Sequence, residues 1–267
     1  MKKFWFILTA LVATCFLVAC SGSQGVSPKT IKEKKKIVVA TESEFAPFEF
    51  KSLVNGKDTL VGADIELAKA IGEKLGVKVE FSVMSFDNVL ASVQSGKADI
   101  AIAGISVTDE RKKVYDFSDS YYTSNQAIIL KKDSKIKKLS QLEGKKVGVQ
   151  EGTTGDIIAS GEKFGEKNKV IVKTDVKRYK KGVDAVMDLK NGAIDAVVID
   201  EKPAQEFVKN NAKKLKLVVD SAGAEYYCIA ITKGNTAYKE EINKQIKAIK
   251  KDGTYDKLKA KYIDSAN

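Results

Sequence analysis

The 267-residue chain contains no histidine. This absence excludes Ser-His-Asp and Cys-His catalytic sets, zinc sites with histidine ligands, and the side chain that most often moves protons near neutral pH. Most hydrolase mechanisms are therefore excluded before any motif is considered.

Cysteine is scarce as well, since only Cys15, Cys20 and Cys228 occur. The first two belong to an N-terminal signal segment, so a mature domain would keep Cys228 alone and could form no disulfide within the chain. Cys228 lies in the apolar run 226–231, where an isolated cysteine is more often a small buried hydrophobe than a nucleophile. We expect no catalysis from it.

Arginine is nearly absent, because only two of the 46 basic residues are arginine and one of them is Arg111. A rigid guanidinium fork binds a carboxylate or phosphate through two parallel hydrogen bonds, which lysine cannot do. Arg111 is therefore a candidate for holding a small anion. A helix cap or a pairing with a surface acid is the alternative, and spacing alone does not separate these.

The formal charge of +11 raises the question of nucleic acid binding. The lysines are scattered among acids, and no aromatic-rich basic cluster or zinc-finger spacing occurs. We expect a solvated lysine surface near an anionic envelope and no nucleic acid partner.

The N-terminus has a short basic start, an apolar stretch from Phe4 to Ala19, and then Cys20 followed by small residues. This pattern is typical of a signal peptide, here residues 1–19, and the apolar stretch is too short to span a membrane comfortably. The segment ending at Cys20 also matches the lipobox of bacterial lipoproteins. We expect an extracytoplasmic protein lipid-anchored to the cell membrane at Cys20; a plain secretion signal and an uncleaved anchor helix are the alternatives.

Residues 20–35 contain few large apolar groups and predict a lipidated flexible tether. From about Lys36 the chain predicts alternating strands and helices. The first unit has strands at 37–40, 77–84 and 98–105 and helices at 61–76 and 87–94. This rhythm is typical of an α/β domain with buried parallel strands.

A second α/β unit follows the charged stretch 131–135. It predicts strands at 147–149, 170–172 and 194–199 and helices after 152–155 and around 183–189. A strand near 215–219, a strand at 226–231 and a helix at 237–249 could complete either unit.

The segment Gly152-Thr153-Thr154-Gly155 follows a strand and opens a helix, so its free backbone N–H groups would favour an anion. It lacks the Gly-Lys-Ser/Thr of a phosphate-binding loop, and a plain strand-to-helix turn is the alternative. Together with Arg111 it suggests two halves that each give donors to one carboxylate at the carboxyl ends of parallel strands.

With these motifs the chain resembles the polar amino acid-binding proteins of ABC importers, the extracellular solute-binding proteins of family 3. The resemblance runs through residues 36–262 in the family's order. Its matching segments are 40–50, 61–68, 98–101, 108–113, 116–122, 152–154 and 252–257.

The resemblance implies a two-lobe α/β fold, the type II periplasmic-binding-protein-like fold with two hinge segments. Lobe 1 would comprise 36–123 plus 224–267, and lobe 2 would comprise 124–223. The family binds its ligand by closing the lobes, without making or breaking a bond.

By the resemblance, Arg111 clamps the ligand α-carboxylate with backbone N–H groups of Ser106 and Thr154, beside Thr153. Asp200 receives the α-ammonium together with the Gly104 carbonyl and the Ser106 hydroxyl. Asp200 ends the apolar strand 194–199, where a ligand-facing acid is expected, although a helix N-cap is the alternative.

The same resemblance places the ligand side chain between Phe45 and Phe86. Glu42 stands where the family commonly has Asp, and Gln150 stands where lysine or another polar residue occurs. Two rings and a carboxylate suit a delocalised cation, which favours arginine, then histidine or lysine. Glutamine and cystine remain open.

The resulting prediction is the membrane-anchored substrate-binding component of an ABC amino acid importer. It would be a monomer that delivers its ligand to a permease with a cytoplasmic ATPase, and no metal or cofactor is implied. The alternatives are an enzyme of the cyclohexadienyl dehydratase type, which shares the architecture, and a sensor or adhesin.

Overall fold

The computed structural model describes residues 26–162 and 173–266. The predicted signal peptide, Cys15, the lipidation site Cys20 and the predicted strand at 170–172 lie outside the described residues. Within these ranges no helix combines the length and the apolar character that a membrane crossing needs.

The first sheet has the strand order β5-β1-β6-β13-β7. Its strands are β1 (Lys36–Thr41), β5 (Lys78–Val83), β6 (Ile100–Ala101), β7 (Tyr115–Phe117) and β13 (Ala230–Thr232). β5 and β6 pair with β1 in parallel, and β13 runs antiparallel to β6 and β7. The C-terminal part of the chain therefore supplies a strand to the N-terminal sheet.

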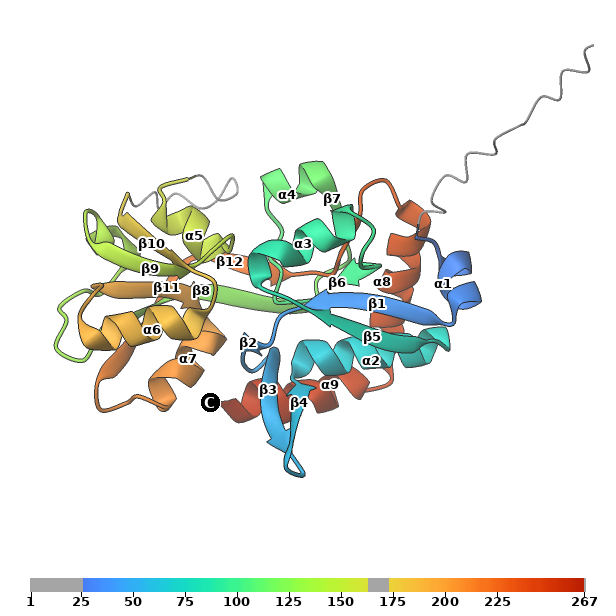
Figure 1. Cartoon of the computed structure of the whole chain (residues 1–267), viewed down its shortest axis with the longest axis horizontal. Helices are drawn as coiled ribbons and strands as arrows, with labels where there is room; N and C mark the ends of the chain where they lie inside the picture. Colours follow the sequence, from blue (N-terminus) through green and yellow to red (C-terminus); the bar gives the residue numbers. More distant parts are fainter. Residues whose placement is uncertain (1–25, 163–172, 267) are drawn as a thin grey trace, which may run out of the picture.

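Helices surround this sheet on both faces (Figure 1). They are α2 (Ala63–Leu75), α3 (Phe86–Gln94), α4 (Asp109–Val114), α8 (Thr236–Lys251) and α9 (Thr254–Leu258), followed by short turns at Lys259–Ile263 and Asp264–Ala266. α2 presents Ile65, Leu67, Ala68 and Ile71 to the core and ends at Gly76, whose φ of 69° is the left-handed conformation glycine favours. We call this sheet and its helices lobe 1.

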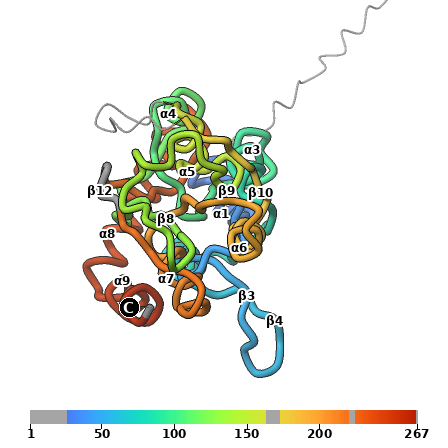
Figure 2. The backbone as a smooth tube through the Cα atoms, turned by 90° about the vertical axis from the view of Figure 1, so that its left-hand side faces the viewer, coloured from blue at the N-terminus to red at the C-terminus, as the bar shows by residue number. Residues whose placement is uncertain are grey.

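A small antiparallel sheet of β2 (Glu44–Phe45), β3 (Glu49–Val54) and β4 (Lys57–Val61) projects from lobe 1 (Figure 1). Seen along the long axis, the hairpin of β3 and β4 projects from the rest of the chain (Figure 2). Its turn is Asn55-Gly56, with φ of 51° and 74°. Asn-Gly with both φ values positive is the preferred two-residue hairpin turn. Sequence analysis did not predict this hairpin, although Asn55-Gly56 is a hairpin-turn signal.

The second sheet has the order β10-β9-β11-β8-β12. Its strands are β8 (Tyr122–Lys131), β9 (Lys146–Gln150), β10 (Asp175–Tyr179), β11 (Ala196–Asp200) and β12 (Leu215–Tyr227), with helices α5 (Thr154–Ala159), α6 (Gly182–Asn191) and α7 (Glu201–Lys209) and a turn η1 (Leu139–Leu142). β9, β10 and β11 are parallel, whereas β8 is antiparallel to both of its neighbours. We call this sheet and its helices lobe 2.

β8 and β12 are the long strands that join the lobes (Figure 1). They pair from Lys131 and Leu215 in lobe 2 to Tyr122 and Tyr227, with a register shift between Asp220 and Glu225. At the lobe 1 end, the rings of Tyr122 and Tyr227 pack edge-on against Phe48. Two adjacent strands therefore form the connection between lobes.

The predicted flexible tether is wrong for its C-terminal part, because helix α1 occupies Pro28–Lys34. Ser27 and Thr30 form a reciprocal capping box, and Ile31 is 1% exposed in the lobe 1 core. Ser27 followed by proline and Thr30 is a helix-start signal that the polar composition of the segment concealed.

Two predicted strands are shorter than expected. Of 98–105 only Ile100–Ala101 pairs in the sheet, because the chain then leaves it and turns at Gly104. The predicted strand 226–231 is divided between β12 and β13, since the chain crosses at Cys228 from one sheet to the other. The Cys228 backbone N–H donates to the Ile105 carbonyl at this crossing.

Candidate ligand-binding site between the lobes

A small cavity lies between the lobes, where strand ends of both sheets face each other. It is lined by Phe45, Phe86, Gly104, Ser106, Arg111, Gln150, Thr153, Thr154 and Asp200. These are nine of the ten ligand-contact residues predicted from the sequence. The tenth, Glu42, accepts a hydrogen bond of 2.8 Å from Gln150 Nε2.

The free volume of this cavity is about 10 Å³, room for about one water molecule. The lobes touch around it, since Gln150 reaches Glu42 and the Arg111 Nη2 donates to the Gly152 carbonyl at 2.9 Å. Lys180 of lobe 2 also pairs with Asp87 of lobe 1 at 2.7 Å. A ligand larger than water therefore requires the lobes or their side chains to move apart.

Arg111 lies on α4 and is only 9% exposed. Its Nη1 donates to the Ser106 carbonyl at 2.6 Å, and its guanidinium carbon lies 5.7 Å from the centre of the Phe86 ring. Burial lowers the pKa of Arg111 to about 10, so it stays cationic at neutral pH. The guanidinium fork faces the cavity and carbonyl oxygens and not a surface acid, which favours the anion-binding interpretation.

Asp200 ends β11 and is 4% exposed. It stands at the N-cap position of α7, but its side chain makes no capping hydrogen bond. Instead the Tyr227 hydroxyl donates to Asp200 Oδ1 at 2.7 Å. Burial, and next the nearby Glu225, raise the pKa of Asp200 to about 8.

Glu225 is a buried acid at this site that sequence analysis missed, and it is 2% exposed. Its carboxylate accepts hydrogen bonds from Ser106 Oγ at 2.5 Å, Thr154 Oγ1 at 2.8 Å and Gln126 Nε2 at 2.7 Å. Burial raises its pKa, and Arg111 acts in the opposite direction. The available signal was an acid placed directly before the apolar run 226–231.

Gly104 is required by close packing. Its φ is 54°, and a Cβ there would lie 2.7 Å from the Phe45 ring. Its N–H donates to Asp64 Oδ2 at 2.8 Å, which fixes the direction of this peptide. Any larger residue would push Phe45 out of the cavity wall.

In lobe 2, Thr153 caps α5, its side chain accepting from the Asp156 N–H at 3.3 Å. Thr154 is the first residue of that helix, so its own N–H has no partner within the helix. Both threonines line the cavity, but their side chains differ in use: Thr153 caps the start of the helix, and Thr154 donates to Glu225.

A second group at the cavity consists of Phe45, Gln150 and Glu42, the last joined by its hydrogen bond to Gln150, whereas Phe86 packs on Arg111. Glu42 is 4% exposed, and burial raises its pKa to about 7. Phe45 and Phe86 are 5% and 7% exposed. Arg111 thus lies near two buried carboxyl groups, those of Asp200 and Glu225, and Glu42 is joined to the cavity through Gln150.

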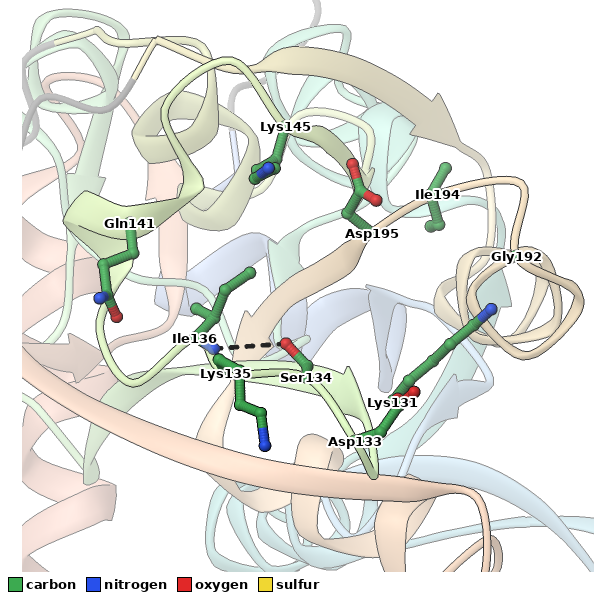
Figure 3. Close-up of a pocket in the computed structure, with 10 residues that line it drawn as sticks. All are labelled: Lys131, Asp133, Ser134, Lys135, Ile136, Gln141, Lys145, Gly192, Ile194 and Asp195. Carbon is green, nitrogen blue, oxygen red and sulfur yellow. Dashed lines mark hydrogen bonds between the residues drawn. The ribbon is translucent and has the colours of Figure 1, made fainter.

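A larger hollow of about 490 Å³ lies elsewhere, on lobe 2 away from lobe 1 (Figure 3). It is lined by Lys131, Asp133, Ser134, Lys135, Ile136, Gln141, Lys145, Gly192, Ile194 and Asp195. Its three lysine side chains point in different directions and no aromatic ring lines it (Figure 3). It lacks the convergent donors and acceptors of the cavity between the lobes.

Cys228 is 4% exposed, and burial raises the pKa of its thiol to about 12, so it is not a thiolate nucleophile. In residues 26–162 and 173–266, no three His, Cys, Asp or Glu side chains are grouped so as to hold a metal ion.

The family profile of bacterial extracellular solute-binding proteins, family 3, matches residues 37–265. The chain is 34% identical over 270 residues to the arginine-binding extracellular protein ArtP of Bacillus subtilis (strain 168), and the match covers 98% of both proteins. These matches span the whole of both lobes.

Two solved structures are also similar. The amino acid ABC transporter substrate-binding protein AbpA from Streptococcus pneumoniae, bound to L-arginine, is 42% identical with a TM-score of 0.79, over 89% of this chain and 97% of that one. An ancestral arginine-binding protein bound to arginine is 46% identical with a TM-score of 0.76, over 86% and 98%. The predicted architecture, the two-lobe type II periplasmic-binding-protein fold, is confirmed by these likenesses.

Proposed function

The chain belongs to the bacterial extracellular solute-binding proteins of family 3, and from this premise we propose that it captures an amino acid with a cationic side chain, arginine first. The ligand would be held between the lobes and delivered to a permease with an ATPase. The protein would act as a monomer and make or break no bond.

The observation that carries this proposal is the set of charges around the cavity. Arg111 can exchange its two carbonyl partners for the two oxygens of an α-carboxylate, and such charge-assisted bonds are the stronger ones. Asp200 faces the same space and can hold the α-ammonium. Glu42, hydrogen-bonded to Gln150 of the cavity wall, then suits a positive group at the far end of the ligand.

The strand pair β8 and β12 supports a hinge between the lobes. We propose lobe boundaries near residues 123 and 224, with 36–123 and 224–267 moving against 124–223. Opening at these two adjacent strands would break the contacts of Gln150 with Glu42 and of Arg111 with Gly152 and admit the ligand.

The test is a melting-temperature survey of the purified protein, unfolded and refolded to remove carried-over ligand. The panel is arginine, lysine, ornithine, histidine, glutamine and cystine. A ligand with a Kd of about 1 μM at millimolar concentration should add about 4 kcal/mol of stability, a shift of several degrees. A response to glutamine or cystine alone would refute the cationic specificity and keep the amino acid clamp.

A dehydratase activity is the second possibility, because the absence of histidine does not exclude it. Arg111 and Asp200 both line the cavity, so the site can hold the two charged groups that every amino acid carries. This arrangement favours binding of an intact amino acid over an elimination reaction. We therefore propose that the protein is no enzyme. Prolonged incubation with cyclohexadienyl acids should give no aromatic product, and turnover would contradict this.

We also propose lipidation at Cys20. Cells that express the Cys20→Ser variant should release the protein from the membrane fraction, and wild-type protein should carry fatty acid label. Equal membrane retention of both forms would contradict the lipid anchor.

A further inference from the structure

We propose that Glu225 is a positioning residue for ligand recognition: it accepts the hydrogen bonds of the Ser106 and Thr154 hydroxyls, so that the lone pairs of Ser106 Oγ are left to accept from the ligand ammonium. This inference rests on the proposed binding of an amino acid between the lobes.

The first step concerns protons. Burial raises the pKa of Glu225, while the hydrogen bonds from Ser106, Thr154 and Gln126 and the charge of Arg111 favour its ionised form. An ionised carboxylate only accepts hydrogen bonds, whereas a hydroxyl has one proton to donate and lone pairs that accept. Ser106 Oγ lies 2.5 Å and Thr154 Oγ1 lies 2.8 Å from the same oxygen, Oε2 of Glu225. Both hydroxyl protons are therefore committed to Glu225, and what remains of Ser106 Oγ for a ligand is an acceptor.

The second step concerns how Glu225 is held. Gln126 Nε2 donates to its other oxygen, Oε1, at 2.7 Å and to Thr154 Oγ1 at 3.2 Å. Gln126 lies on β8 and Glu225 on β12, so the carboxylate is carried by the strand pair that joins the lobes. Ser106 belongs to lobe 1 and Thr154 to lobe 2, so one carboxylate orders a hydroxyl on each side of the cavity.

The third step concerns selectivity. A site whose oriented acceptors are Ser106 Oγ and the Asp200 carboxylate favours a ligand group with several donors, such as an ammonium. A neutral ligand with no donor there would leave these buried acceptors unpaired, which is costly. Glu225 would thus contribute to choosing amino acids over the corresponding des-amino acids.

The variant Glu225→Gln reverses this arrangement while keeping the shape. If its amide oxygen keeps the bond from Gln126, its NH₂ group faces Ser106 and Thr154 and donates to them. Affinity for arginine should fall by about tenfold or more, the usual worth of a hydrogen bond to a charged group. Affinity for 5-guanidinopentanoate, which is arginine without its α-amino group, should fall less than about threefold.

The measurement is calorimetry of both ligands on wild-type, Glu225→Gln and, as a matched control, Glu240→Gln, an exposed acid on α8. Equal losses for the two ligands would mean a merely structural role and overturn the inference. If the wild-type protein binds no amino acid, the proposed function is overturned as well. This outcome differs from equal losses in the variant, which would overturn only the role of Glu225.

Two further variants secure the test. Glu225→Asp keeps an acceptor-only carboxylate and should restore part of the arginine affinity that Glu225→Gln loses; a loss as large as that of the amide would count against the inference. If the des-amino ligand binds too weakly to measure, Ser106→Ala should cost much in wild-type and little in the Glu225→Gln background. Additive losses would then overturn the proposal.

Discussion

The two ends of the cavity are built differently. At the end with Arg111 and Asp200, each charged group has bonded neighbours from well-separated parts of the chain, and Glu225 connects the two lobes behind them. At the other end, Glu42 accepts a side-chain hydrogen bond from Gln150, which lines the cavity together with Phe45. The end with many hydrogen bonds suits the α-carboxylate and α-ammonium, which all amino acids share. The end with few hydrogen bonds can change its specificity for the ligand side chain by one substitution.

The largest effect is expected from Arg111→Ala, which removes the partner of the α-carboxylate. Every amino acid ligand should lose about 30-fold or more in affinity, since a buried carboxylate left unpaired costs about 2–5 kcal/mol. Calorimetry measures the loss of affinity for two different amino acids. A loss for only one of them would contradict the role of Arg111 as the partner of the α-carboxylate that both share.

The matched control is Arg178→Ala, at the chain's other arginine. Arg178 pairs with Asp156, does not line the cavity, and is 46% exposed in its side chain. Its loss should change affinity less than about threefold, as is usual for a partly exposed ion pair. An equal effect of both variants would show that fold stability, and not the clamp, is being measured.

Asp200→Asn should have the next largest effect, about tenfold or more for every amino acid, because the ammonium loses its ionic partner while the shape is kept. Titration of arginine and glutamine on this variant checks it. A selective loss for arginine would instead place Asp200 at the side-chain end.

Glu42→Gln tests the other end. Arginine should lose about tenfold, and glutamine should change less than about threefold, because only the cationic group faces this acid. A competition experiment between arginine and glutamine measures directly how the ratio of their affinities changes. Parallel losses for both would abolish the distinction between the two ends.

Solution pH should act on stability and binding with opposite signs. Burial raises the pKa of Glu42 to about 7 and of Asp200 to about 8, so the folded, ligand-free protein holds protons that the unfolded chain would release. Their stabilising contribution is fully present below pH about 4 and is lost as pH rises through about 7 to 8. A cationic ligand needs both acids ionised, so its affinity should rise over this window.

Melting temperatures without ligand and Kd values for arginine at pH 5.5, 7 and 8.5 check both signs together. Glu42→Gln should flatten both curves. An affinity for arginine that stays constant from pH about 5.5 to 8.5 would contradict the assignment of these acids to the ligand's positive groups.

The smallest effect is expected from Lys180→Ala. Lys180 bridges Asp87 and Glu151 at 2.7 and 2.9 Å and is 56% exposed in its side chain, so salt screens it. Affinity should fall less than about threefold at low salt, with no difference at high salt. A large loss that salt does not reduce would show that closure depends on this contact.

Local motifs made much of the site predictable. Arg111 follows its N-cap Thr108 by three residues, and the two threonines of 153–154 stand at the start of α5. Such features are readable because they depend on neighbours along the chain. Nine of the ten predicted contact residues line the cavity, and the tenth, Glu42, is hydrogen-bonded to one of them.

Contacts between residues far apart in the sequence could not be predicted from local motifs. Glu225 lies 119 residues from Ser106 and 71 from Thr154 in the sequence. No motif near Glu225 predicts either hydrogen-bond partner. The sequence analysis predicts no strand over β8, because its pairing partner β12 lies far along the chain.

The sequence by itself determined the chemical groups available and the alternation of strands and helices, since the absence of histidine, the scarcity of arginine and apolar periodicity are local properties. Only the tertiary structure decided which acids face one another, in what protonation state, and which way hydroxyl protons point. These depend on burial and on hydrogen-bond partners, and both arise when segments remote in the chain exclude water from a common space.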